Sequence, residues 1–67
     1  MEEFKIRTYG KTELALKYAP ELTGSGALKK LQRWIKFNPR LRPLLKIKGR
    51  VYTPRHVRRI VEELGEP

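Results

Sequence analysis

One stretch of the chain, residues 27–37 (ALKKLQRWIKF), separates apolar from polar positions at the spacing of an α-helix. At about 100° per residue, its apolar side chains fall on an arc of roughly 120°. They are Ala27, Leu28, Leu31, Trp34 and Ile35. The opposite side carries Ser25, Lys29, Lys30, Arg33 and Lys36. The pattern predicts a helix over about residues 24–37, with one face in a core and the other face cationic.

Two shorter elements are predicted before this helix. Residues 3–9 (EFKIRTY) alternate at period two and include β-branched and aromatic residues, which predicts a short strand with one buried face. Residues 11–18 (KTELALKY) predict a helix of about two turns, with Gly10 as its N-cap and the Glu13 carboxylate reaching back to the cap N–H. Pro20 ends this helix, because the residue before a proline avoids the α region.

The start of the central helix has two candidate N-caps, Thr23 and Ser25. Gly24 and Gly26 lie in its first turn, although each glycine costs a helix about 1 kcal/mol relative to alanine. Two explanations stay open at this point. Either backbone N–H groups approach a phosphate at the helix N-terminus, or a flexible loop precedes a helix that begins at Ala27.

Prolines and a glycine divide the segment that follows. Asn38 and Pro39 end the central helix, and residues 39–45 (PRLRPLL) predict at most one helical turn, whose leucines pack on the core. Residues 45–53 (LKIKGRVYT) predict a β-hairpin, because Gly49 supplies the positive φ that a tight turn needs. The cations projecting from this hairpin would be Lys46, Lys48 and Arg50.

The last helix, predicted over residues 53–64, has the clearest signals. Thr53 is expected as its N-cap, Pro54 as its first helical residue and Gly65 as its C-terminal stop. Apolar residues recur at i, i+3, i+4 and i+7, which makes a complete core stripe. These residues are Val57, Ile60, Val61 and Leu64.

Taken in order, the elements are strand, helix, turn, basic helix, short turn, hairpin and helix. This order predicts an α+β fold, a small winged helix-turn-helix with three helices and a two- or three-stranded sheet, as a single domain over residues 1–67. In such a module the second helix enters the major groove, and the hairpin lies along the backbone or the minor groove.

Three stretches carry a resemblance to known proteins, KIRTYGKTELALKY, LKKLQRWI and VYTPRHVRRIVEELGEP. They resemble a family of short Bacteroides proteins catalogued as a domain of unknown function, which implies a bacterial protein but no particular activity. More loosely, the topology and the ELA, RW and YTP…V..I markers resemble winged-helix modules of the excisionase and MerR type. That resemblance implies DNA binding and a role such as transcription regulation. The turn at residues 19–22 is longer than in that pattern and no long dimerisation helix follows, so ligand sensing of the MerR kind is not implied.

The distribution of charge points to a polyanionic partner. Sixteen Lys and Arg against seven Asp and Glu give a net charge of +9. No acid lies between Leu22 and Val61, yet this window holds twelve of the sixteen cations. Such asymmetry favours nucleic acid, and the alternative is a merely solvated surface on a basic protein.

The composition argues against catalysis and against a metal or cofactor. The chain has no cysteine and one histidine, and its acids lie near the two ends, so no nucleophile–base pair or metal cluster is expected. No small-molecule ligand is implied. Because the longest apolar runs are two or three residues, neither a membrane span nor a secretory signal is expected, and the cytoplasm or the nucleoid is the expected location.

The candidate nucleic-acid-binding residues are Ser25, Lys29, Lys30, Gln32, Arg33, Lys36, Lys48 and Arg50. Arg33 can pair bidentately with guanine and Gln32 with adenine, while the lysines would meet phosphates. Each residue alone could be an ordinary solvated side chain. Four cations on one helix face and a cationic hairpin together favour a shared role.

Three aromatic residues need separate interpretation. Trp34 is expected in the core, because it lies on the apolar arc. Phe37 falls on the basic side, where it either covers the following turn or stays exposed for a partner. His56, in the first turn of the last helix, is expected at the surface. The tyrosines lack the spacing of a base-stacking platform, which disfavours single-strand binding.

The sequence therefore predicts a non-catalytic module that binds double-stranded DNA, largely through phosphates. A monomer of this size would bury roughly 600–1,000 Å² of surface, so a homodimer or a larger complex would be needed for specificity. The alternative is a protein-interaction adaptor whose basic face docks an acidic partner or a DNA-processing assembly. Structured RNA is a third option that charge alone does not reject.

Overall fold

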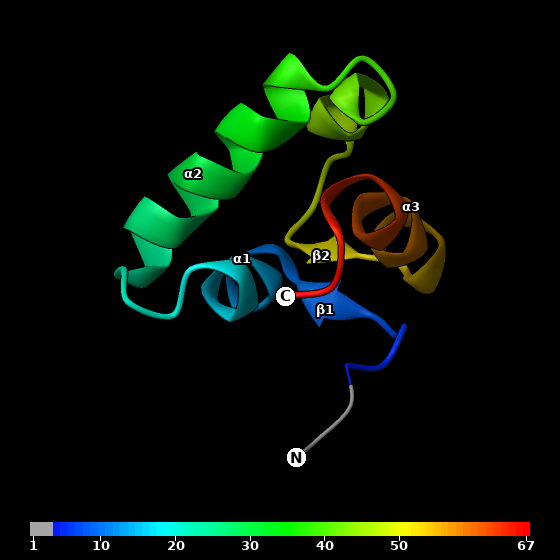
Figure 1. The fold of residues 1–67 in the computed structure, drawn as a ribbon. Coiled ribbons are helices and arrows are strands. Elements are labelled where there is room, and N and C mark those ends of the chain that lie inside the picture. The colour runs from blue at the N-terminus through cyan, green and yellow to red at the C-terminus, as the bar shows by residue number, and fades with distance from the viewer. Residues whose placement is uncertain (1–3) are drawn as a thin grey trace.

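Three α-helices and one small sheet surround a single hydrophobic core in the computed structural model, which describes residues 4–67. The elements in chain order are β1 (Tyr9–Gly10), α1 (Lys11–Tyr18), α2 (Gly24–Phe37), the 3-10 helix η1 (Arg42–Lys46), β2 (Val51–Tyr52) and α3 (Pro54–Leu64) (Figure 1). The strands β1 and β2 pair antiparallel, with Tyr9 opposite Tyr52. The predicted α+β class with three helices is confirmed, and the sheet has two strands.

The N-terminal strand is shorter than predicted, and the expected alternation of buried side chains is wrong. Of the predicted range 3–9, only Tyr9 is in a strand, and residue 3 lies outside the described part. Ile6 is 38% exposed, whereas Tyr9 is only 3% exposed. The reason is that no strand pairs with residues 4–8 in the described chain, while Tyr9 stacks on Phe4 at 5.3 Å between ring centroids.

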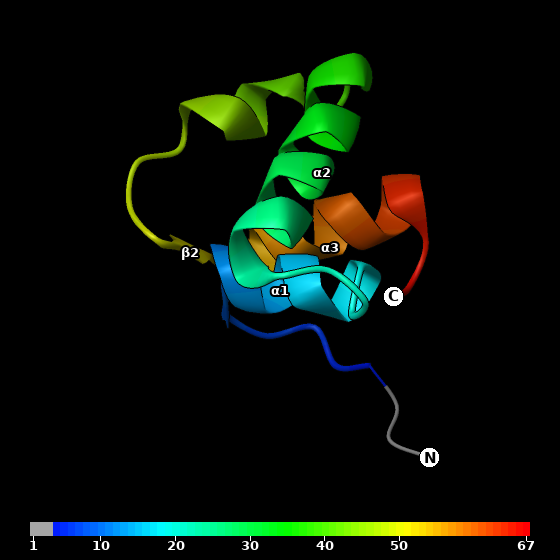
Figure 2. The same cartoon turned by 90° about the vertical axis from the view of Figure 1, so that its left-hand side faces the viewer.

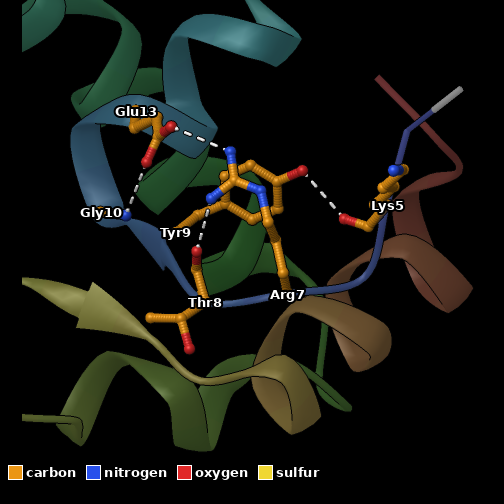
Figure 3. A network of polar contacts seen from close by, with 6 residues as sticks. All are labelled: Lys5, Arg7, Thr8, Tyr9, Gly10 and Glu13. Carbon is orange, nitrogen blue, oxygen red and sulfur yellow. Dashed lines mark hydrogen bonds and ion pairs between the residues drawn. The ribbon is translucent and has the colours of Figure 1, made fainter. Parts of the chain in front are cut away.

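Capping chemistry fixes α1 at the predicted residues. The backbone N–H of Gly10 donates to the Glu13 carboxylate at 3.2 Å, and Arg7 pairs with the same carboxylate at 3.3 Å (Figure 3). The hydrogen bond from Gly10, followed by that from Arg7, lowers the pKa of Glu13. The negative side chain also complements the positive end of the helix dipole.

The N-terminus of α2 decides between the two candidate N-caps. Thr23 is the N-cap, and its Oγ1 accepts a hydrogen bond from the Gly26 N–H at 3.2 Å. Gly24 has a packing role, because a Cβ at this position would lie 2.9 Å from Cγ2 of Thr12 on α1. The helix begins at Gly24, so the explanation of a flexible loop before a helix that begins at Ala27 is wrong, and a phosphate at this N-terminus stays a prediction.

The predicted hairpin at residues 45–53 is wrong. Residues 42–46 form η1, and only Val51 and Tyr52 form a strand, so the two arms of a hairpin are not present. The turn does contain Gly49 at φ 100°, as expected for glycine. Of the leucines expected to pack inward, Leu41 and Leu44 are buried but Leu45 is 43% exposed, because the three-residue repeat of a 3-10 helix turns it outward.

The hairpin does not form because α1 hydrogen-bonds to carbonyl groups of the segment in which the hairpin was predicted. The Lys11 ammonium donates to the carbonyl oxygen of Ile47 at 2.7 Å. The backbone N–H of Lys11 donates to the carbonyl oxygen of Arg50 at 2.8 Å. Residues 47–50 are therefore held against the start of α1, and β2 pairs with the N-terminal strand β1.

The signals at both ends of α3 are confirmed. Thr53 is its N-cap, Pro54 begins the helix, and Gly65 follows it with φ 85°. His56, predicted at the surface, is half-buried, and its Nδ1 accepts a hydrogen bond from the Thr53 N–H at 3.3 Å. Its ring also lies edge-on to Tyr52 at 6.4 Å.

The core places α2 and α3 on opposite sides of the molecule. Its buried side chains are Tyr9, Leu14, Ala15, Ala19, Ala27, Leu31, Ile35, Leu41, Leu44, Tyr52, Val57 and Ile60. In Figure 1, α2 runs along one side and α3 along the other. Figure 2, turned by 90°, shows α2 in front and α3 behind it. The outer faces of these two helices therefore point in different directions.

Candidate nucleic-acid interface

The outer face of α2 is a continuous stripe of exposed cations. Ala27, Leu31 and Ile35 are buried at 1% exposure or less, and they hold the inner face of the helix on the core. Lys29, Arg33 and Lys36, spaced at i, i+4 and i+7, are all exposed on the opposite side. No other described element covers this stripe.

Four of the candidate residues meet around one open hollow on this face. The hollow is lined by Lys29, Gln32, Arg33, Lys36, Phe37 and Leu45. Two kinds of group therefore face the same space, namely ammonium, guanidinium and amide donors from α2 and two exposed apolar side chains. The donors can bond to phosphates and to base edges, and the apolar groups can contact a sugar or a thymine methyl.

The positive charge of this stripe is not neutralised within the described chain. The ion pairs of residues 4–67 are Arg7–Glu13 and Arg40–Glu63, and neither includes a cation of α2. The first turn of α2 also contains no acid. An uncompensated row of cations on a fixed helix gives a positive potential that attracts polyanions.

Two of the predicted residues on α2 lie apart from this hollow. The Lys30 ammonium sits 5.4 Å from the centroid of the Trp34 ring, so it points to a flank of the helix. Ser25 is exposed in the first turn, two residues after the N-cap Thr23. Both stay accessible to a ligand that covers the whole length of α2.

Lys48 and Arg50 are exposed in the irregular segment 47–50, which replaces the predicted hairpin. This segment runs from η1 down one side of α2 to β2 (Figure 2). Its backbone is held by the two hydrogen bonds to Lys11. The two cations thus belong to a second, less regular positive site rather than to the hollow on α2.

A second hollow, which is largely apolar, adjoins the cationic stripe. It is lined by Tyr18, Trp34, Phe37, Asn38, Pro39, Leu64, Glu66 and Pro67. Tyr18 and Trp34 meet edge to face with their centroids 6.2 Å apart. Trp34, predicted in the core, is only half-buried, because it packs against the core with one side and lines this hollow with the other. Burial, followed by the nearby Glu66 charge, raises the pKa of Tyr18 to about 12.

The comparisons with known proteins identify the family. A family model described as a domain of unknown function (DUF4248) matches residues 5–67. The chain belongs to this family. The resemblance to a domain of unknown function is thereby confirmed, and the similarity to excisionase and MerR modules stays a prediction. No curated protein and no solved structure matches the chain.

In this DUF4248 chain, Phe37 and Leu45 are the site residues that the sequence did not assign. Phe37 is 73% exposed and lines both hollows, so it joins the cationic stripe to the second, largely apolar hollow. Its place on the basic side of the helical pattern was a signal of this exposure. Leu45 gave no such signal, because the geometry of a five-residue 3-10 helix decides its direction.

The described part of this DUF4248 chain contains neither a metal cluster nor a membrane helix. No group of three or more His, Asp or Glu side chains within residues 4–67 could hold a metal ion. Within the same residues, no helix is long and apolar enough to cross a membrane.

Proposed function

We propose that this chain is a non-catalytic module that binds double-stranded DNA, with α2 as the reading helix in the major groove. The observation that carries the proposal is the uncovered stripe of Lys29, Arg33 and Lys36, which no acid of residues 4–67 neutralises. At 14 residues, α2 is about 21 Å long, and a helix of that size fits the major groove.

The residues of α2 divide into base readers and phosphate contacts. Arg33 presents a planar fork of donors that matches guanine O6 and N7, and Gln32 offers the amide pair that matches adenine. Lys29 and Lys36 are point charges suited to phosphates on either side of the groove. Lys30 and Ser25 extend the contact along the helix.

We interpret the three helices as a winged helix-turn-helix in which an irregular segment replaces the wing. Under this proposal α1 and α2 form the helix-turn-helix, and segment 47–50 takes the place of the hairpin. Its cations Lys48 and Arg50 would contact the sugar-phosphate backbone next to α2. Such a module would serve transcription regulation or excision, as the looser resemblance implies, and would act in the cytoplasm at the nucleoid.

One such module has a small footprint and would bind weakly by itself. A single domain of this size covers roughly 600–1,000 Å², and specific sites are usually read by larger or dimeric proteins. We therefore expect the chain to act as a homodimer or within a larger protein complex.

A gel-shift titration with duplex DNA tests the proposal. Wild type should retard the duplex at about 50 mM salt, whereas Lys29→Glu with Arg33→Glu should abolish the retardation, because phosphate contacts dominate affinity. The matched control is Lys5→Glu with Lys17→Glu, which reverses two exposed cations away from α2 and should weaken binding much less. Circular dichroism checks that each variant stays folded.

A second candidate function, a protein-interaction adaptor, is favoured by the apolar hollow beside α2. Phe37 is 73% exposed at its rim, and exposed aromatic residues are enriched at protein interfaces. An acidic partner would match the net charge of the chain. If wild type retards no duplex at about 50 mM salt, the adaptor function replaces DNA binding, and a parallel titration with a hairpin RNA separates the RNA alternative.

A further inference from the structure

We propose that the outer face of α3 is a second polyanion-binding surface, so that one chain joins two DNA duplexes. The surface consists of three exposed arginines, Arg55, Arg58 and Arg59. The inference rests on the proposed function, because α2 supplies the first surface. The evidence for the second surface comes from α3, on the other side of the molecule.

The three arginines share one outward face of α3 with the exposed Glu62, which lies one turn further along the helix. Val57 and Ile60 are fully buried, so the opposite side of α3 faces solvent. At about 100° per residue, Arg55 lies opposite these two residues, and the other two arginines lie within about 60° of it. None of the three takes part in an ion pair of residues 4–67, so their guanidinium donors stay available.

The order of charges along α3 is the reverse of what stabilises a helix. The arginines occupy its first two turns, and Glu62 and Glu63 occupy its last turn. Cations are unfavourable near the positive N-terminal end of the helix dipole, and acids are unfavourable near the negative end. Glu63 is accounted for by its partners, because its carboxylate accepts a hydrogen bond from the Asn38 amide at 3.1 Å and pairs with Arg40 at 3.7 Å. The ion pairs of residues 4–67 do not account for the three arginines, whose charge a polyanion would neutralise.

The spacing of the arginines suits a duplex better than a single anion. From Arg55 to Arg59 the helix rises about 6 Å. Along one strand of duplex DNA a phosphate recurs about every 3.4 Å of the axis, so three cations spread over about 6 Å can reach about two successive phosphates. Arginine also bonds phosphate bidentately, which an equally placed lysine does not do.

The two surfaces lie far enough apart to hold two duplexes at once. Figures 1 and 2 place α2 and α3 on opposite sides of the core. The shortest dimension of the chain is 21 Å, which exceeds two Debye lengths of about 8–10 Å at physiological salt. Repulsion between duplexes bound on the two sides is therefore largely screened.

A two-duplex capture experiment tests this inference. Beads that carry one duplex are saturated with protein, washed, and offered a second, fluorescent duplex. The α3 variant is Arg55→Gln, Arg58→Gln and Arg59→Gln, and the matched α2 variant is Lys29→Gln, Arg33→Gln and Lys36→Gln. Each variant loses three charges from the +9 of the chain, so their net charges are equal.

We expect wild type to capture the second duplex. The α3 variant should bind the first duplex within about threefold of wild type but capture at least about tenfold less of the second, since only its second set of phosphate contacts is lost. The α2 variant should bind the first duplex much more weakly and should also lose capture.

Three results would overturn the inference, and they differ from failure of the proposed function. If wild type binds the first duplex on the beads but captures no second duplex, the chain has a single DNA-binding surface. The DNA-binding proposal then still stands. If the α3 variant captures as much of the second duplex as wild type does, the two duplexes are joined through contacts between copies of the chain and not through α3. An α2 variant that captures as much as wild type shows that α2 is not one of the two surfaces. If wild type does not bind the first duplex, the proposed function itself fails.

Discussion

The outer face of α2 and the segment 47–50 both present cations, but they hold them in different ways. The α2 cations stand on a 14-residue helix that three nearly fully buried side chains fix to the core. Lys48 and Arg50 stand on an irregular segment that two hydrogen bonds from Lys11 tie to α1. A fixed helix can position hydrogen-bond donors for base edges. Contacts to phosphates tolerate small displacements of the cation, so an irregular segment held by two hydrogen bonds is sufficient for them.

The largest expected effect is the loss of the anchor under α2. Leu31→Ala should lower the free energy of unfolding by about 3 kcal/mol, because it removes a side chain at 1% exposure and leaves a cavity. Urea denaturation followed by Trp34 fluorescence measures this change. Gln32→Ala, at the exposed neighbouring position, should change stability by less than about 0.5 kcal/mol. Equal effects from the two variants would contradict the packing of α2 described above.

The next effect concerns the tie that holds segment 47–50. Lys11→Met removes the donor to the Ile47 carbonyl and should cost about 2 kcal/mol of stability, since a charged, part-buried hydrogen bond is lost. Lys17→Met is the control on the same helix, and its ammonium has no hydrogen-bond partner within residues 4–67. Faster amide exchange in residues 47–50 of the Lys11 variant alone would confirm the tie.

A charge reversal on the segment should affect binding less than one on α2. Lys48→Glu with Arg50→Glu should weaken duplex binding about tenfold, because only phosphate contacts at the edge of the interface are lost. Lys29→Glu with Arg33→Glu changes the charge by the same amount and should weaken binding at least about a hundredfold. Fluorescence anisotropy on one duplex compares the two pairs. Equal losses would mean that binding depends on net charge alone.

The smallest effect is an alkaline change in stability from Tyr18. Its folded pKa is raised from 10.0 to about 12, so the buried neutral phenol contributes stability that is fully present below pH 10 and is lost as the pH rises toward 12. Tyr18→Phe should flatten this part of the pH profile. Burial also raises the pKa of Tyr52, so some alkaline dependence should remain in the variant. An unchanged profile in Tyr18→Phe would contradict the assignment.

The helices were predictable because their signals lie within four residues of each other. Gly10 with Glu13, Thr23 as a cap, and Thr53 followed by Pro54 each set a boundary through local hydrogen bonds or backbone geometry. The 3.6-residue period of α2 likewise separates buried from exposed positions without knowledge of the rest of the fold. For the same reason, the exposure of Lys29, Arg33 and Lys36 could be predicted.

The sheet and the edges of the site depend on residues far apart in the sequence. Tyr9 pairs with Tyr52, and the Lys11 ammonium takes the carbonyl of Ile47, so the apparent hairpin signal around Gly49 was outweighed by long-range contacts. Tertiary partners, rather than local pattern, decide strands this short.

The salt dependence of duplex binding by wild type and by the Lys29→Gln, Arg33→Gln, Lys36→Gln variant tests the central claim most directly. If the chain neutralises roughly four to six phosphates, a plot of log K against log salt concentration should have a slope of about −4 to −5 for wild type. Each lost phosphate contact should reduce the slope by about 0.9, and the variant loses the phosphate contacts of Lys29 and Lys36, so its slope should fall to about −2 to −3. An unchanged slope in the variant, or no measurable binding by wild type, would contradict the account.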